Sequence, residues 1–215
     1  MTVNVNGGYI LAGGASSRMG ADKAALRLGG LTFVERVAAA LRPVAREVFV
    51  VSSKHDAARW GLPVVPDLYE NSGALGGLHA ALTHANMRRG ANAGGRRIAV
   101  VSCDLPFVTG ALLKRLASFC AAEWDAVAPV QEDGRAQPLC AVYESERCGP
   151  VADLLLGSGE LRPRELLARV RTRWVAFEEL ADLDGAGLFF MNVNTPEEYE
   201  RAREAAARRE NYPRI

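Results

Sequence analysis

The sequence predicts an α/β protein with three layers, a Rossmann-like arrangement in which helices cover a mostly parallel sheet. The main observation is that short apolar runs alternate with amphipathic stretches from end to end of the chain, a pattern typical of strands that alternate with helices. A second is the almost fully apolar run I-A-V-V-S at residues 98–102, as expected for a central strand buried on both faces. A third is the glycine-rich loop that follows the first predicted strand, residues 9–12.

The further elements follow in order along the chain. A helix is predicted over residues 32–41, where Phe33, Val37 and Leu41 share one face, and Pro43 ends it. Thr109 is expected to cap a helix over residues 109–120. Other helices are predicted over residues 76–88, 151–156 and 163–170, and strands over residues 47–52, 63–65, 126–130, 139–143 and 189–193. The strand at 139–143 is expected to pair in the antiparallel direction, and the strand at 189–193 is expected to be the last.

The final helix has the clearest start signal. Thr195 is suited to cap it, Pro196 takes the first helical position, and Glu198 completes a T-x-x-E capping box. The segment at residues 88–97, R-R-G-A-N-A-G-G-R-R, is expected to be a loop and is not a convincing domain boundary. The sequence therefore predicts a single domain over residues 1–215.

Composition excludes several classes of function. The chain has 26 basic and 25 acidic residues, a net charge of +1, so no broad positive surface for nucleic acid or an anionic membrane is expected. An anionic ligand must then be held by a local site. The sequence contains no run of about 18 apolar residues, so no membrane span is expected. The first residues show no basic segment followed by a long apolar run, so no secretory signal is expected. Cys103, Cys120, Cys140 and Cys148 form no C-x-x-C pair and are expected to be reduced thiols of a cytoplasmic protein.

The strongest local motif is L-A-G-G-A-S-S-R-M-G-A-D-K at residues 11–23. Gly13 and Gly14 let the backbone approach a ligand and point N–H groups at phosphate oxygens, while Arg18 and Lys23 add positive charge where a triphosphate would lie. Two glycines after a strand can also be a simple turn. The motif is neither G-x-G-x-x-G nor G-x-x-x-x-G-K-[ST], so the dehydrogenase and P-loop fingerprints are absent.

This motif resembles the signature of nucleotidyltransferases that activate cofactor precursors and sugars, and above all that of the molybdenum cofactor guanylyltransferases. The likeness extends over nearly the whole chain in five motifs. The others are P-D at residues 66–67 with G-A-L-G-G at 73–77, C-D-L-P at 103–106, Q-P-L at 137–139 followed by Ala141 and Tyr143, and N-V-N-T-P-E-E at 192–198.

The resemblance implies a single-domain nucleotidyltransferase fold and a magnesium-dependent enzyme. The expected reaction transfers GMP from GTP to the phosphate of Mo-molybdopterin, forms the guanine dinucleotide cofactor and releases pyrophosphate. GTP and Mo-molybdopterin are therefore the expected partners, with molybdoenzymes or other cofactor-synthesis proteins as further candidates and no role for nucleic acid or membrane. Arg18, Lys23 and Asp104 are the expected catalytic residues.

Asp104 and Asn194 are the expected metal ligands. Asp104 directly follows the most apolar strand, at the carboxyl end where ligands of open α/β sheets bind, and carboxylate oxygen suits Mg²⁺. Alternatively, Asp104 caps a turn before Pro106. The family resemblance gives Asn194 either a metal-ligand role or, with Asn192, contact with the pterin, and a simple turn position is the other interpretation.

The resemblance also assigns the nucleotide and the pterin phosphate. The expected nucleotide-binding residues are Leu11, Ala12, Gly13, Gly14, Lys23, Ser53, Asp67 and Asp104. The chain departs from the family in two places: Ser52-Ser53 stands where an asparagine is common, and Ala74 replaces the proline of the G-P-L-A-G-type turn. Arg164, or its neighbour Arg162, is the arginine expected to meet the pterin phosphate, although either also fits an ordinary surface position.

Three other functions stay open on the sequence alone. The same chemistry on other substrates would make the protein a cytidylyltransferase or a sugar-phosphate nucleotidyltransferase. A non-catalytic nucleotide-binding module is a second class, although a degenerate copy is expected to lose Lys23 or Asp104, and both are present. A nicotinamide dehydrogenase is a third class, but this sequence lacks the glycine fingerprint of such enzymes.

Overall fold

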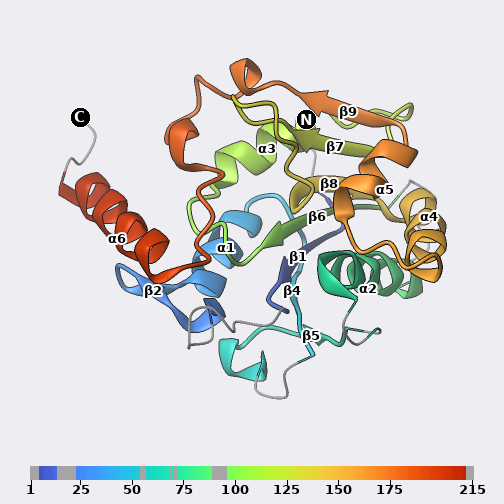
Figure 1. Ribbon diagram of the computed structural model, residues 1–215, viewed down its shortest axis with the longest axis horizontal. Coiled ribbons are helices and arrows are strands. Elements are labelled where there is room, and N and C mark those ends of the chain that lie inside the picture. The colour runs from blue at the N-terminus through green and yellow to red at the C-terminus, as the bar shows by residue number, and fades with distance from the viewer. Residues whose placement is uncertain are drawn as a thin grey trace.

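The computed structural model describes residues 5–13, 23–53, 57–67, 69, 72–88 and 96–211. In this part of the chain one seven-stranded sheet has the order β5-β4-β1-β6-β8-β7-β9 (Figure 1). Its strands are β1 (Gly7–Leu11), β4 (Val48–Val51), β5 (Val64–Val65), β6 (Arg97–Ser102), β7 (Ala126–Pro129), β8 (Cys140–Glu144) and β9 (Thr172–Val175). The principal helices are α1 (Phe33–Leu41), α2 (Gly73–Met87), α3 (Gly110–Ser118), α4 (Ser145–Gly157), α5 (Pro163–Arg169) and α6 (Pro196–Asn211).

The sheet is mostly parallel, as predicted. β1 pairs in parallel with β4 and β6, β4 with β5, and β7 with β9. The exception is β8, which is antiparallel to both of its neighbours, β6 and β7. The antiparallel direction expected for residues 139–143 is therefore confirmed. The mostly parallel sheet confirms the predicted α/β class.

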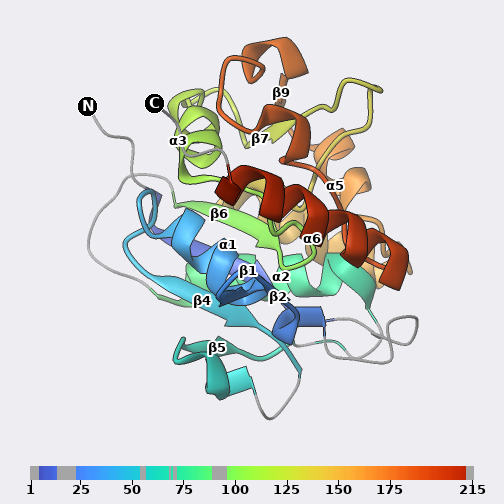
Figure 2. The ribbon, with the colours of Figure 1, turned by 90° about the vertical axis from the view of Figure 1, so that its left-hand side faces the viewer.

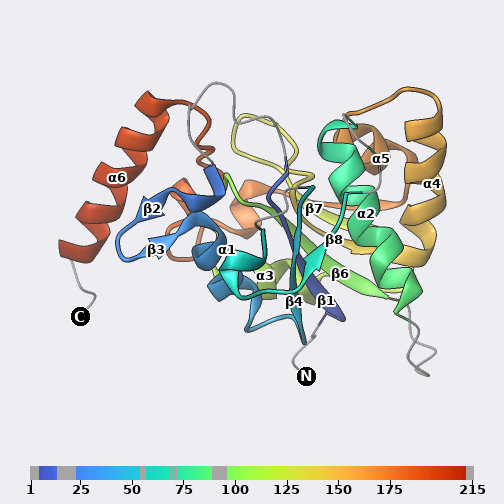
Figure 3. The ribbon, with the colours of Figure 1, turned by 90° about the horizontal axis from the view of Figure 1, so that it is seen from below.

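Helices cover both faces of the sheet (Figure 3). One face packs against α1 and α3, and the other packs against α2, α4 and α5. Alternate residues of each central strand serve the two layers. In β1, for example, Ile10 joins the α1 and α3 side, while Tyr9 and Leu11 join the opposite side. This double burial explains why the strands have nearly continuous apolar sequences.

Side chains cap α1, α3 and α6, and the sequence predicts two of these caps, those of α3 and α6. The Thr32 hydroxyl accepts from the backbone N–H of Glu35 at 3.2 Å, and Glu35 Oε2 accepts from the N–H of Thr32 at 2.7 Å. The Thr109 hydroxyl caps α3 through the N–H of Leu112. The capping box of the last helix is also present, because the N–H of Glu198 donates to the Thr195 hydroxyl at 3.2 Å and the N–H of Thr195 donates to Glu198 Oε2 at 3.1 Å.

The last helix forms a third apolar cluster away from the two main layers. α6 lies beside the short hairpin of β2 (Arg27–Leu28) and β3 (Leu31–Thr32), as Figure 2 shows. The cluster consists of Leu28, Phe33, Phe107, Val193, Ala202, Ala205 and Ala206. Because Val193 stands just before the helix, this packing fixes the start of α6 against the body of the protein.

Residues 189–193 form no strand, so that prediction is wrong. They follow the short 3-10 helix η4 (Ala186–Leu188), and the run is apolar because Phe189 and Val193 are buried in the core rather than because they pair in the sheet. The last strand is instead β9, whose T-R-W-V sequence gives only Val175 to the interior. An edge strand that leaves most of its side chains partly exposed lacks the apolar run used to find strands.

Two helices begin earlier than predicted, α2 at Gly73 instead of residue 76 and, by a wider margin, α4. α4 starts at Ser145, six residues before the expected start at 151. Glu144 caps it, since its carboxylate accepts from the N–H groups of Glu146 and Arg147, and Pro150 is accommodated inside it. Among the described residues, every helix is too short or too polar to cross a lipid bilayer.

Candidate active site

The carboxyl ends of four neighbouring strands meet at one edge of the sheet. In the strand register Leu11 of β1 stands opposite both Val51 of β4 and Ser102 of β6. Hydrogen bonds continue the alignment past the strand ends, from the N–H of Cys103 to the carbonyl of Leu11 at 3.0 Å and from the N–H of Ala12 to the carbonyl of Val51 at 3.0 Å. The segments expected to bind nucleotide and metal therefore leave the sheet side by side.

Asp104 lies just past β6, at the centre of this edge. Burial raises the pKa of its carboxyl group, against the opposing effects of a hydrogen bond from the Ser102 hydroxyl and of the positive charge of Lys23. The carbonyl of Asp104 accepts from the N–H of Val193 at 3.0 Å, which holds the segment before α6 against the end of β6. A partly buried carboxylate with a nearby lysine is a group that a further cation would stabilise.

Lys23 and Asn194 meet beside this carboxylate. Lys23 Nζ donates to Asn194 Oδ1 at 2.7 Å, although the two residues are 171 positions apart in the sequence. Lys23 begins the 3-10 helix η1 (Lys23–Ala25) after the glycine-rich loop, and Asn194 precedes the cap of α6. The N–H of Asn194 donates to Glu198 Oε2 at 2.6 Å, so the capping residue of α6 also fixes the position of Asn194.

Glu198 has a second effect at this site. Its negative charge contributes to the raised pKa of Asp104. Two carboxylates, a lysine and an asparagine thus share a small volume, and Ser102 donates into it. The sequence predicts Glu198 only as a cap, because nothing local shows that its side chain lies near Asp104. Ser102 is two positions from Asp104, but the sequence pattern does not single it out.

Asp67 lies at the same edge, after β5, between two glycines. Its carboxylate Oδ1 accepts from the N–H of Tyr69 at 3.3 Å. A Cβ atom at Gly13 would lie 4.0 Å from Asp67 Oδ2, and one at Gly76 would lie 3.4 Å from Oδ1. Burial raises the pKa of Asp67, and the Tyr69 hydrogen bond and the charge of His79 oppose this rise.

The other predicted residues fall into three groups. Leu11 and Ala12 are buried, and Ser53 is exposed just past the end of β4. Asn192 and Asn194 both line an open hollow of about 390 Å³ in front of α6. Gly14 and Arg18 lie outside the described residues, as does most of the loop expected over 88–97.

Arg162 and Arg164 lie at the start of α5. Arg162 binds Glu160 through two hydrogen bonds of 2.8 and 2.6 Å, and Arg164 Nε lies 3.6 Å from Glu165 Oε1. The neighbouring Leu161 packs close to Gly73 at the beginning of α2. Neither arginine lines the hollow that contains Asn192 and Asn194.

Asp104 and Asn194 offer oxygen atoms that suit a magnesium ion. Among the described residues no three His, Cys, Asp or Glu side chains gather as a closed metal site. Mg²⁺ does not need one, because water and substrate phosphates complete its shell around one or two protein oxygens. The raised pKa of Asp104 agrees with a carboxylate that is incompletely compensated without a cation.

Comparison with known proteins gives four related findings. Residues 8–174 match the MobA-like NTP transferase domain. A protein of Pelotomaculum thermopropionicum described as a probable molybdenum cofactor guanylyltransferase is 36% identical over 197 residues, 91% of this chain and of that protein. A molybdenum cofactor guanylyltransferase of Desulfosudis oleivorans is 33% identical, with 92% of this chain and 94% of that protein covered. Molybdopterin-guanine dinucleotide biosynthesis protein A of Archaeoglobus fulgidus has a similar crystal structure, with a TM-score of 0.77, 25% identity and coverage of 94% and 99%.

Proposed function

The chain belongs to the MobA-like NTP transferase family, and from this premise we propose that it transfers GMP from GTP to the phosphate of Mo-molybdopterin. The names of its relatives support this choice of nucleotide and acceptor. The observation that carries the proposal is the hydrogen bond between Lys23 and Asn194 next to Asp104. It joins the end of the glycine-rich loop to the segment before α6 at the edge where α/β sheets bind ligands.

The nucleotide is expected to lie along the loop that follows β1. Leu11, Ala12, Gly13 and Gly14 supply backbone groups, and Arg18 and Lys23 supply positive charge to the triphosphate. Asp67 accepts hydrogen bonds from ribose hydroxyls or the guanine edge, and Ser53 is an additional polar contact. The position of Asp67 close to Gly13, the first glycine of the loop, supports this assignment.

Asp104 and Asn194 are the residues that would hold magnesium. When bound, the ion would neutralise negative charge on the triphosphate during transfer. Lys23 and Arg18 orient the phosphates, and Asn192, Asn194 and Arg164 are the residues we assign to the pterin substrate. Arg164 stays a prediction on the resemblance alone.

The chemical step needs no general base. The acceptor phosphate is already anionic at neutral pH, so one of its oxygens attacks the α-phosphorus directly. That P–O bond forms as the bond from the α-phosphorus to the bridging oxygen breaks, and pyrophosphate leaves with this oxygen. The protein then acts mainly by positioning the two phosphates and by neutralising charge.

The test is a transfer assay with the purified protein. Mo-molybdopterin and Mg²⁺ are incubated with GTP, CTP, ATP or UTP, and the dinucleotide product and pyrophosphate are measured. We expect product with GTP and a loss of product when EDTA is added. Preference for CTP would make the protein a cytidylyltransferase, and transfer only to a sugar phosphate would replace the acceptor. GTP binding without any product would leave a non-catalytic nucleotide-binding module.

A further inference from the structure

The hollow in front of α6 contains two arginines that the proposed mechanism does not use. It measures about 390 Å³ and is lined by Arg135, Phe190, Met191, Asn192, Asn194, Glu198 and Arg201. Asn194, on this wall, is also the residue that accepts from Lys23. The hollow therefore adjoins the position of phosphate transfer, where the second substrate must enter.

Arg135 reaches the hollow from the turn that connects β7 to β8. The turn is closed by hydrogen bonds from the N–H of Gln131 to the carbonyl of Arg135 at 2.9 Å and from the N–H of Gly134 to the carbonyl of Gln131 at 2.9 Å. Gly134 has a φ of +80°, which favours glycine. Asp133 holds Arg135 Nε at 2.7 Å. The arginine is thus presented by an ordered turn and keeps its remaining guanidinium N–H groups as donors.

Arg201 faces the same hollow from α6, one helical turn after Glu198. The start of this helix is fixed by its capping box and by the bond from the N–H of Asn194 to Glu198. The connection between β7 and β8 and the beginning of α6 lie at the same end of the sheet (Figure 3). Two elements about 65 residues apart in the sequence therefore bring one arginine each to a common wall.

The chemistry of the wall favours an anionic, partly flat ligand. Guanidinium groups bind phosphate and similar anions through paired hydrogen bonds. Carboxylates accompany both arginines, since Asp133 binds Arg135 at 2.7 Å, Glu198 lines the hollow, and the charge of Arg201 helps to lower the pKa of Glu197. Phe190 and Met191 supply apolar surface, and the Asn192 and Asn194 amides supply donors and acceptors suited to a polar heterocycle.

We propose that Arg135 and Arg201 clamp the second substrate, an anionic phosphomonoester that carries a polar heterocycle. This inference rests on the proposed function and adds the residues that set acceptor affinity. Lys23 and the glycine-rich loop serve the nucleotide, whereas the two arginines serve the acceptor. Arg164 is not part of this clamp, because it does not line the hollow and instead lies beside Glu165 at the start of α5.

The test compares Arg135→Gln, Arg201→Gln and the double variant with Arg203→Gln. Arg203 is the matched control, because it lies on the same helix, is exposed and binds Glu200 rather than the hollow. We expect each single variant to raise the acceptor KM about tenfold and the double variant by about a hundredfold, with the GTP KM changed less than about twofold. Lysine at both positions should restore part of the affinity, since charge returns without the planar fork.

A binding measurement separates the clamp from the proposed activity. Purified Mo-molybdopterin is titrated into the Asp104→Asn protein with and without the two arginine substitutions, so that no turnover is required. Weaker binding after loss of the arginines supports the clamp. Equal binding overturns it, as does a rise in acceptor KM confined to an Arg164→Gln variant. If the protein with both arginines neither binds nor converts this acceptor but does use another, the proposed function fails at the acceptor, and the clamp is overturned as a site for molybdopterin.

Discussion

At the scale of single residues, the candidate active site consists of side chains that only the fold brings together. Lys23 and Asn194 share a hydrogen bond of 2.7 Å across 171 positions of sequence. Their separate motifs predict that each is functional, but not that they touch. Glu198 could not be assigned from the sequence, because its effect on Asp104 follows from the proximity of β6 and α6.

Asp104→Asn should lower the rate of GMP transfer by about a hundredfold or more, because it removes the carboxylate that we propose binds the metal ion. The fold should persist, since asparagine has nearly the same size as aspartate and burial disfavours the charged form of the Asp104 carboxyl group. Initial rates and thermal melting curves measure the two effects. Asp184→Asn is the control, as an exposed carboxylate paired with Arg209. Full activity of Asp104→Asn would exclude the assigned role.

Gly76→Ala should destabilise the protein by about 1–3 kcal/mol, because overpacking strains a close contact. A Cβ atom at Gly76 would lie 1.6 Å from Ser72 Oγ, whereas one at Gly77 would meet only Leu11, at 3.7 Å. Gly77→Ala is therefore the matched control and should be neutral or stabilising by up to about 1 kcal/mol. Urea unfolding measures both. A further Ser72→Gly substitution should recover much of the loss, and an unaffected Gly76→Ala protein would contradict the packing described here.

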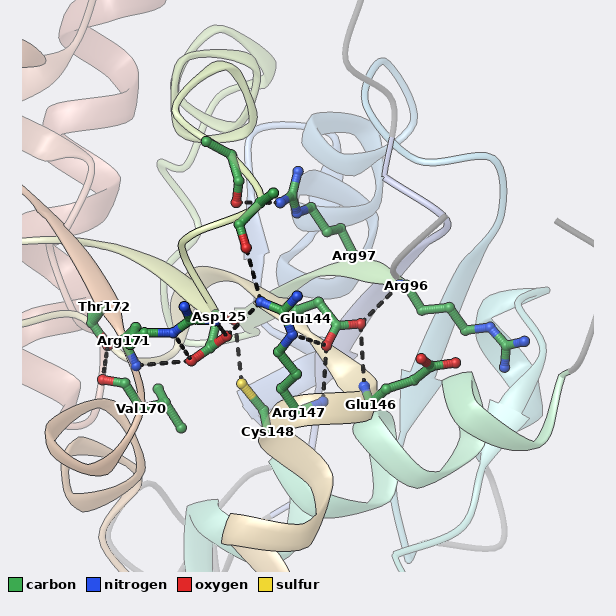
Figure 4. A network of polar contacts seen from close by, with 12 residues as sticks. Arg96, Arg97, Asp125, Glu144, Glu146, Arg147, Cys148, Val170, Arg171 and Thr172 are labelled. Carbon is green, nitrogen blue, oxygen red and sulfur yellow. Dashed lines mark hydrogen bonds and ion pairs between the residues drawn. The ribbon is translucent and has the colours of Figure 1, made fainter. Parts of the chain in front are cut away.

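At the scale of elements, an ionic network joins the ends of β7, β8 and β9 to α4 (Figure 4). Asp125, nearly buried ahead of β7, accepts from the backbone N–H of Arg171 at 3.0 Å and from its guanidinium at 3.1 and 2.9 Å. Arg147 of α4 donates to the same carboxylate at 2.9 Å. These bonds hold the pKa of Asp125 well below its usual value, with the Arg171 guanidinium as the main cause. The network thus fixes the edge strand that the sequence failed to reveal.

Asp125→Asn should therefore destabilise the protein in a pH-dependent way, by about 3 kcal/mol near neutral pH. Because the folded-state pKa is lowered, the aspartate contributes its full stability above the unfolded-state pKa of about 4 and loses it as the pH falls toward the folded value. The difference in unfolding free energy between the two proteins should be constant from pH 7 to about pH 5 and shrink below about pH 4.

Urea unfolding at each pH measures this difference. Asp182→Asn is the control, because Asp182 binds Arg115 at an exposed position where an ion pair contributes little. A difference between the wild-type and Asp125→Asn proteins that stayed unchanged down to pH 2 would contradict the assigned network.

The elements that the sequence predicted best are those with a strong local cause. The central strands have apolar residues on both faces, and α3 and α6 have capping side chains that bond as expected. The failures have the opposite character. Residues 189–193 are apolar because Phe189 and Val193 fill the core, and β9 is a strand because Arg171 and its neighbours are held by Asp125, a contact 46 residues away. Such distant contacts leave no local pattern.

At the scale of the whole molecule, a continuous sheet and the packing of α6 predict cooperative unfolding. β7 and β9 join the strands of the amino-terminal half through β8, and α6 buries its alanines against Leu28 and Phe33. We expect residues 1–215 to unfold as one domain, with a single calorimetric transition whose calorimetric and van't Hoff enthalpies agree. Two separated transitions would show that the chain contains two domains.

The central claim is that Asp104, Lys23 and Asn194 hold the metal-bound triphosphate at the carboxyl edge of the sheet. Its most direct test is a crystal structure with a non-hydrolysable GTP analogue and Mn²⁺, in which anomalous scattering locates the ion. We expect an anomalous peak at the Asp104 carboxylate and a hydrogen bond from Lys23 Nζ to a phosphate oxygen. A triphosphate bound elsewhere, or an ion remote from Asp104, would contradict it.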